Sequence, residues 1–157
     1  FRFETKFPMP GMFRILTDFY PKDATPQMAS NTLFVKGQPA PARPLAADMS
    51  PKQGTNVTVS LTTEPEKPLA GFKTLMFFKL DNVDGFEQYL GAWGHMLAAS
   101  EDLVDMIHVH PFIANGSANV QFNIIFPRPG TYKVWVQFQR KGVVNTVAFV
   151  VPVEELR

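Results

Sequence analysis

The sequence Phe-Pro-x-Pro-Gly occurs twice in this chain, at residues 7–11 and 126–130, and it restricts the fold more than any other feature. Neither proline can donate a hydrogen bond to a neighbouring strand, and the glycine can adopt backbone conformations that are closed to other residues. Each copy is therefore expected to form a corner between two strands.

The residues around the two motifs also correspond, which indicates an internal duplication. After an insertion in the first copy, Thr32–Val35 is matched to Ala148–Val151 as a last strand. At a constant offset, the matched positions are Phe3, Phe7, Pro8, Pro10, Gly11, Phe13, Ile15 and Phe19 with Phe122, Phe126, Pro127, Pro129, Gly130, Tyr132, Val134 and Phe138.

Short alternating runs dominate the chain and predict an all-β fold. Fifteen Phe and fourteen Pro accompany almost no helical periodicity. Strands are expected near residues 55–63, 72–80, 119–126, 131–140 and 143–152, and residues 86–90 are interpreted as a single helical turn. In the strand that follows the second motif, Tyr132, Val134, Val136 and Phe138 share one face. With the histidine hairpin described below this makes about seven strands in about 100 residues, the proportions of an immunoglobulin-like (cupredoxin-like) antiparallel β-sandwich.

Three segments are expected along the chain. Residues 55–157 form a complete sandwich domain, residues 38–54 are a Pro- and Ala-rich linker, and residues 1–37 are a partial sandwich repeat equivalent to the C-terminal half of a first domain. The chain opens without an initiator Met, so we expect a processed form or a part of something longer. We expect the Phe-rich faces of residues 1–37 to be covered by the second domain, by a protein partner or by a missing N-terminal segment; they carry Phe1, Phe3, Phe7, Phe13 and Phe19.

All three histidines of the chain lie within residues 94–111. Two apolar runs flank the polar residues 100–105, a pattern that predicts a β-hairpin. With 100–105 as the loop, Leu97 faces His108 and His95 faces His110, so the three imidazoles share one face. A slip of one residue would send His95 to the other face.

The shared face leaves two interpretations open. Directly opposed Cβ atoms lie about 5 Å apart, close enough for three ring nitrogens to reach one metal ion. Alternatively, the histidines form a structural or vestigial cluster satisfied by backbone carbonyls.

We expect the ion at His95, His108 and His110 to be copper, with zinc as an alternative. Imidazole suits both metals, and the absence of cysteine excludes thiolate and blue-copper sites. Met96 and Met106 flank the cluster and are expected to alternate away from it into the core. The acidic residues Glu101, Asp102 and Asp105 are expected to be solvated loop residues.

Other function classes are not supported by the sequence. Fifteen basic and fourteen acidic residues without a basic stripe argue against nucleic acid as a partner, and no apolar run reaches the ~18 residues of a transmembrane helix. No nucleophile elbow, phosphate loop or spaced carboxylate pair is present, so the chain is not expected to be an enzyme.

The succession Tyr-Leu-Gly-Ala-x-Gly-His, Ser-Glu-Asp, His-x-His-Pro and Phe-Pro-x-Pro-Gly-x-Tyr-Lys-Val resembles secreted bacterial proteins with immunoglobulin-like domains. These proteins handle heavy metals and copper, in the neighbourhood of the YtkA-like and CopC-like proteins. The resemblance covers residues 55–153 and implies a periplasmic or secreted location, with His95, His108 and His110 as metal ligands.

Two hypotheses follow. The first is an extracytoplasmic metal-binding module. The second is a structural scaffold subunit of a larger cell-envelope complex in which the histidine site is vestigial or unoccupied, favoured by the partial repeat at residues 1–37 and by the outward-facing Trp135.

Overall fold

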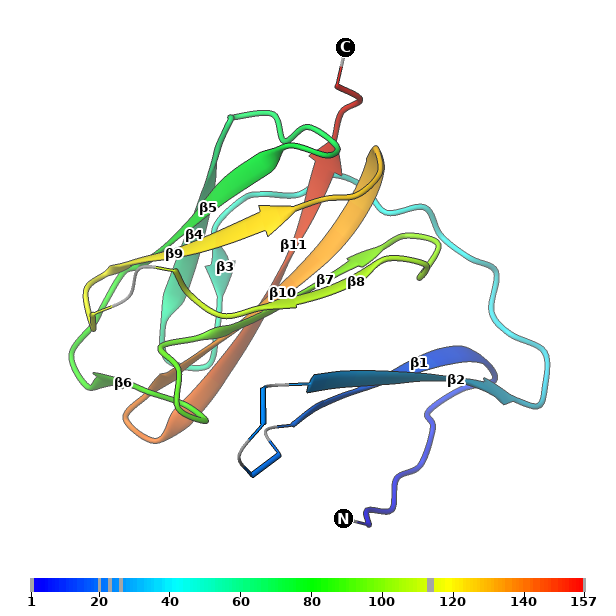
Figure 1. The fold of residues 1–157 in the computed structure, drawn as a ribbon. Helices are drawn as coiled ribbons and strands as arrows, with labels where there is room; N and C mark the ends of the chain where they lie inside the picture. The colour runs from blue at the N-terminus through cyan, green and yellow to red at the C-terminus, as the bar shows by residue number, and fades with distance from the viewer. Residues whose placement is uncertain (1, 20, 23, 26, 113–114, 157) are drawn as a thin grey trace. The chain divides into compact units, whose positions relative to one another are not determined.

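The computed structural model describes residues 2–19, 21–22, 24–25, 27–112 and 115–156, so Phe1 lies outside the described residues. The chain divides into two compact units, residues 1–43 and residues 44–157. Each unit is described by itself below (Figure 1).

The prediction of an all-β chain is confirmed, since every regular element in the described ranges is a strand. The predicted helical turn at residues 86–90 is wrong. Phe86–Glu87 forms the short strand β6, which pairs with β10 because Phe86 packs against Phe138 and the Glu87 carboxylate accepts a hydrogen bond from the Gly142 amide. Within the part of the chain that the structure describes, no helix has the length and hydropathy needed to cross a bilayer.

Residues 44–157 contain two antiparallel sheets (Figure 1). One sheet has the order β11-β10-β7-β8, with β6 also paired to β10, and the other has the order β3-β4-β5-β9. The strands are β3 (Lys52–Gln53), β4 (Thr58–Glu64), β5 (Lys73–Leu80), β6 (Phe86–Glu87), β7 (His95–Ser100), β8 (Met106–Val109), β9 (Asn119–Ile125), β10 (Gly130–Arg140) and β11 (Val143–Val153).

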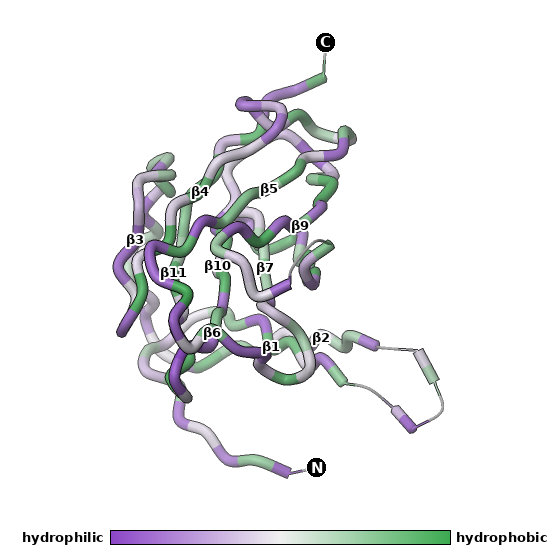
Figure 2. The backbone as a smooth tube through the Cα atoms, turned by 90° about the vertical axis from the view of Figure 1, so that its left-hand side faces the viewer, coloured by the Kyte–Doolittle hydropathy of each residue, from purple (hydrophilic) through white to green (hydrophobic). Residues whose placement is uncertain are grey.

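One hydrophobic core lies between the two sheets, because hydrophobic and hydrophilic residues follow one another along the strands (Figure 2). Phe78 of β5 contacts Phe122 of its own sheet and Phe138 and Phe149 of the other, with ring centroids 5.4, 6.1 and 5.8 Å apart. The predicted inner face of β10 is confirmed: Tyr132, Val134, Val136 and Phe138 are all buried.

The second Phe-Pro-x-Pro-Gly motif forms the corner at which the chain passes from β9 in one sheet to β10 in the other. Gly130 has a φ of +138°, which favours glycine, and the rings of Phe126 and Tyr132 pack at 4.8 Å with an interplanar angle of 55°.

The first motif has the same local geometry within residues 1–43. Gly11 has a φ of +135°, and the rings of Phe7 and Phe13 pack at 4.8 Å and 54°. The motif leads into β1 (Gly11–Phe19), which pairs antiparallel with β2 (Gln27–Val35), as β10 pairs with β11. The duplicated sequence therefore forms the same glycine and ring geometry and the same hairpin twice, but a strand precedes the motif only in the second copy among the described residues.

The predicted alignment of the last strand of the first copy with that of the second copy is wrong by two residues. Val35 pairs with Gly11 and Val153 pairs with Gly130, so Thr32–Val35 corresponds to residues 150–153 and not to Ala148–Val151. This correspondence follows from counting paired residues from the corner glycine. It is hard to recognise in the sequence, because the connection between β1 and β2 is longer than the one between β10 and β11.

Part of the predicted linker, residues 38–54, is an integral part of the second unit, which begins at residue 44. Asp48 forms a bridge with Val150, Met49 packs against the core, and Lys52–Gln53 pairs with β4 as β3.

Candidate metal centre

The histidines lie on the β7–β8 hairpin, and its predicted register is confirmed. Leu97 pairs with His108 and Ala99 pairs with Met106, with residues 101–105 in the connection. His95 begins β7, and His110 follows β8 by one residue. Met96 pairs with Val109, so the next pair in this register is His95 opposite His110.

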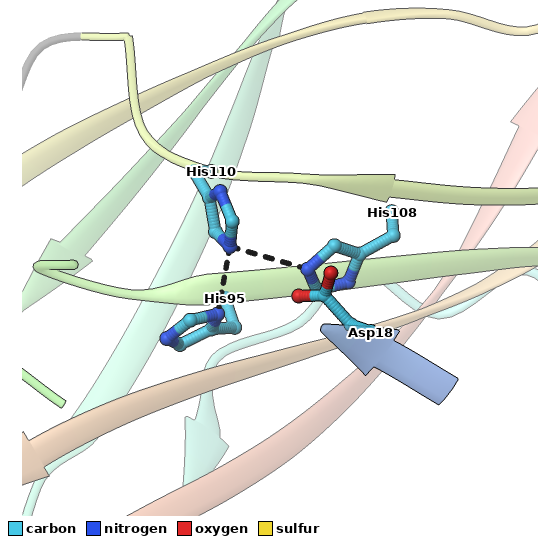
Figure 3. Close-up of side chains that lie close together, drawn as sticks. All are labelled: Asp18, His95, His108 and His110. Carbon is cyan, nitrogen blue, oxygen red and sulfur yellow. Dashed lines mark hydrogen bonds between the residues drawn. The ribbon is translucent and has the colours of Figure 1, made fainter. Parts of the chain in front are cut away.

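The three imidazoles converge on the outer face of this hairpin (Figure 3). The Nε2 atom of His110 lies 3.0 Å from Nδ1 of His95 and 3.2 Å from Nε2 of His108. His95 is 8% exposed, and the other two rings are half-buried. The odd-numbered residues Ile107 and Val109 pack against the core, which confirms that the histidines of β8 point the other way.

These spacings match the edges of a metal coordination polyhedron. With a metal–nitrogen distance of about 2.05 Å, two nitrogens of a tetrahedral site lie about 3.3 Å apart. Two of the three nitrogen–nitrogen distances are close to this spacing, and the three ligand atoms all lie within 4.8 Å of one another.

Hydrogen bonds between the three rings cannot both form at His110. Nε2 of His110 faces two nitrogens, but an imidazole nitrogen carries in its ring plane either one hydrogen or one lone pair. It can therefore make an ordinary hydrogen bond with one neighbour and not with both. A cation at the shared point would accept all three lone pairs.

A backbone carbonyl that the sequence analysis did not single out orients His95. The carbonyl oxygen of Tyr89 lies 2.8 Å from His95 Nε2, the ring nitrogen that points away from the cluster, and the Tyr89 ring packs edge-on against the imidazole at 5.7 Å. In the sequence, the only signal for this contact is the pair of glycines at 91 and 94, which predicts a turn before the hairpin.

The acidic residues of the β7–β8 connection are engaged by Arg128 of the second corner motif. Arg128 Nε donates to Asp105 at 2.9 Å, and its terminal nitrogens donate to both oxygens of Asp102 at 3.1 Å. Hydrogen bonds from the Ser100 hydroxyl and the Val104 amide, followed by Arg128, lower the pKa of Asp102, and Asp105 and Asp102 raise the pKa of Arg128. Glu101 accepts the Leu45 amide at 2.7 Å. These three carboxylates thus hold the hairpin loop in place.

A sequence profile of the family described as Domain of unknown function (DUF8832) matches residues 49–155. The chain belongs to this family. The match includes both sheets of the second unit and all three histidines. No curated protein and no solved structure matches the chain.

The two methionines near the DUF8832 histidines differ in position. Met96 is fully buried in the core, as predicted. The prediction for Met106 is wrong: Met106 is opposite Ala99 and two residues from His108, so it shares the histidine face. Side chains separated by two positions on one strand lie on the same side, and the residue numbers alone contain this information.

Trp135 lies on the outer face as predicted, opposite Leu97 and Ala148, and the ammonium group of Lys133 lies 5.2 Å from the centre of its ring. Trp93, the other tryptophan, packs against Phe86 at 5.1 Å.

Proposed function

We propose that the second unit binds one transition-metal ion through His95, His108 and His110. The observation that carries the proposal is the convergence of three ring nitrogens, of which the central one faces the other two at 3.0 and 3.2 Å. We favour binding over catalysis, because the nearby acidic residues Glu101, Asp102 and Asp105 all accept hydrogen bonds from protein groups.

Copper is the favoured ion, and zinc is the alternative. The three ligands are imidazoles, which suit both ions, and the sequence contains no cysteine. Met106 places a thioether residue on the histidine face, and thioethers favour copper over zinc.

The topology of the second unit supports an immunoglobulin-like sandwich as its fold. The Tyr132 hydroxyl lies 3.1 Å from the carbonyl oxygen of Arg128, four residues upstream, at the corner where the chain changes sheet. This arrangement corresponds to the tyrosine corner of immunoglobulin-like domains. A periplasmic or secreted location rests on the resemblance to YtkA-like and CopC-like proteins.

The proposal is tested by isothermal titration of Cu(II) and Zn(II) into the metal-free full chain. We expect one ion per chain for the wild type and a large loss of affinity for a His108→Ala, His110→Ala variant. Structural zinc sites with four ligands contribute about 10–16 kcal/mol, so each lost ligand costs roughly 3 kcal/mol, or about a hundredfold in Kd.

The matched control is Gln137→Ala, which changes the outer-face residue paired with His95 but removes no imidazole. Its affinity should equal that of the wild type. Equal heats from the wild type and the double histidine variant would contradict the proposal.

A scaffold role is the second candidate, and the apolar surface of residues 1–43 favours it. Phe3 and Phe34 are 72% and 75% exposed, and Met9, Met12 and Met28 are also exposed. Such a surface is typical of a protein interface. Size-exclusion chromatography with light scattering tests this candidate: a concentration-dependent oligomer supports it, and a stable monomer that remains soluble at high concentration contradicts it.

A further inference from the structure

The Tyr89 carbonyl belongs to a tight turn that precedes β7. The amide of Tyr89 donates to the carbonyl of Ala92 at 2.8 Å, and the amide of Ala92 donates back at 3.1 Å. Between them Leu90 and Gly91 have φ values of 49° and 82°, as the two central residues of a type I′ turn do. The Tyr89 oxygen therefore accepts two hydrogen bonds, one from Ala92 and one from the His95 ring.

This contact determines which nitrogen of His95 carries a hydrogen. A carbonyl oxygen has no hydrogen to donate, so Nε2 of His95 must be the donor at 2.8 Å. In a neutral imidazole the lone pair is then on Nδ1. Nδ1 is the atom that faces His110 Nε2 at 3.0 Å.

We infer that His95 binds the metal through Nδ1 while His108 and His110 bind through Nε2, and that the Tyr89 carbonyl positions His95 for this role. The inference rests on the proposed metal-binding function and deepens it. Ligand histidines commonly donate their second ring N–H to a carbonyl or a carboxylate, which fixes the tautomer and makes the ligating nitrogen more basic.

The turn that positions the Tyr89 carbonyl contains a residue in an unfavourable backbone conformation. Leu90 is a non-glycine residue in the left-handed region, where its Cβ crowds the following carbonyl oxygen. Its side chain is 74% exposed, so no burial of Leu90 offsets this cost. Residues held in such regions cluster at functional sites.

The first test uses long-range 1H–15N correlation spectra of the imidazoles in the 15N-labelled full chain, with and without Zn(II). In the metal-free protein we expect His95 in the Nε2–H tautomer. On addition of Zn(II), the Nδ1 resonance of His95 should shift and its Nε2 should remain protonated, while Nε2 shifts for His108 and His110.

The outcomes separate the inference from the proposed function. If Zn(II) binds and the shifted nitrogen of His95 is Nε2, the inference is overturned and the metal site stands. If Zn(II) shifts no imidazole nitrogen and the titration with Cu(II) also shows no binding, the proposed function fails, and the inference fails with it. An Nδ1–H tautomer of His95 in the metal-free protein also overturns the inference.

The second test compares two glycines at which an added Cβ strains the backbone and meets no neighbouring atom. A Cβ at Gly91 or at Gly71 meets no atom within 4 Å, and their φ values are 82° and 73°. Gly91 belongs to the Tyr89 turn, whereas Gly71 precedes β5 in the other sheet. A valine at either position is equally unfavourable in this region.

We expect Gly91→Val and Gly71→Val to lower stability by similar amounts in urea unfolding. Only Gly91→Val should weaken Zn(II) binding, by about ten- to hundredfold, the usual effect of losing such a supporting group. Equal Zn(II) affinities for the two folded variants would overturn the positioning role of Tyr89. If Gly91→Val does not fold, the tautomer measurement on the wild type still decides the inference.

Discussion

At the scale of single residues, Tyr132 links the core to the corner and to the hairpin loop. Its ring is 1% exposed, while its hydroxyl lies 2.8 Å from the Asp105 carboxylate and 3.1 Å from the Arg128 carbonyl. Burial, followed by the hydrogen bond to Asp105, raises the pKa of Tyr132 from 10.0 to about 12. The buried hydroxyl is thus kept neutral.

This raised pKa predicts a loss of stability at alkaline pH. The folded pKa exceeds the unfolded one, so the contribution is complete below about pH 10 and is lost as the pH rises towards 12. Tyr132→Phe should lower the free energy of unfolding by about 1 kcal/mol at pH 8, because the half-buried Asp105 Oδ2 loses one of its donors and keeps Arg128. Urea unfolding at pH 8 and pH 11 should show this difference shrinking at pH 11, and a constant difference would contradict the assignment.

At the scale of elements, Arg128 connects the second corner to the β7–β8 loop. The equivalent residue of the first copy is Met9, so the ion pairs with Asp102 and Asp105 are a property of the second copy alone. The pKa of Asp102 is lowered, so its contribution to stability is present above the usual range of an aspartate and is lost as the pH falls through the lowered value.

Arg128→Met, which introduces the residue of the first copy, should therefore loosen the hairpin loop. Because Arg128 and Asp102 are about half exposed and solvent screens their charges, we expect only a small loss of global stability. Amide hydrogen exchange should accelerate at residues 101–105 and remain unchanged in the β4–β5 pair. Unchanged protection of the loop would show that the turn is held by its own backbone bonds and by Ser100.

At the scale of the whole molecule, the two units differ in what they can bury. Residues 44–157 contain both sheets and the complete core, whereas the regular structure described in residues 1–43 is one two-stranded sheet. A single hairpin is marginally stable in water, while two sheets around a core fold independently.

A fragment of residues 44–157 should therefore unfold cooperatively and bind Zn(II) with the affinity of the full chain. A fragment of residues 55–157 should be less stable, because it lacks β3, the Asp48 bridge and the core contact of Met49. Thermal unfolding with and without Zn(II) measures both effects. A fragment of residues 44–157 that folds but binds Zn(II) more weakly than the full chain would contradict this prediction.

The sequence by itself determined the local features of this protein. Alternation of period two specified the strands and the inner face of β10, and the two apolar runs around residues 100–105 specified the register of β7 and β8. These features depend on neighbours along the chain, so they can be read from the order of residues. The same alternation, counted correctly, also places Met106 on the histidine face.

Only the tertiary structure decided the contacts that complete the candidate site. The carbonyl that orients His95 depends on the left-handed conformation of Leu90, a residue whose side chain does not favour it. The engagement of Asp102 by Arg128 joins residues 26 positions apart. The first contact depends on the conformation of one turn and the second on how the strands are ordered in space, and side-chain periodicity carries no information about either.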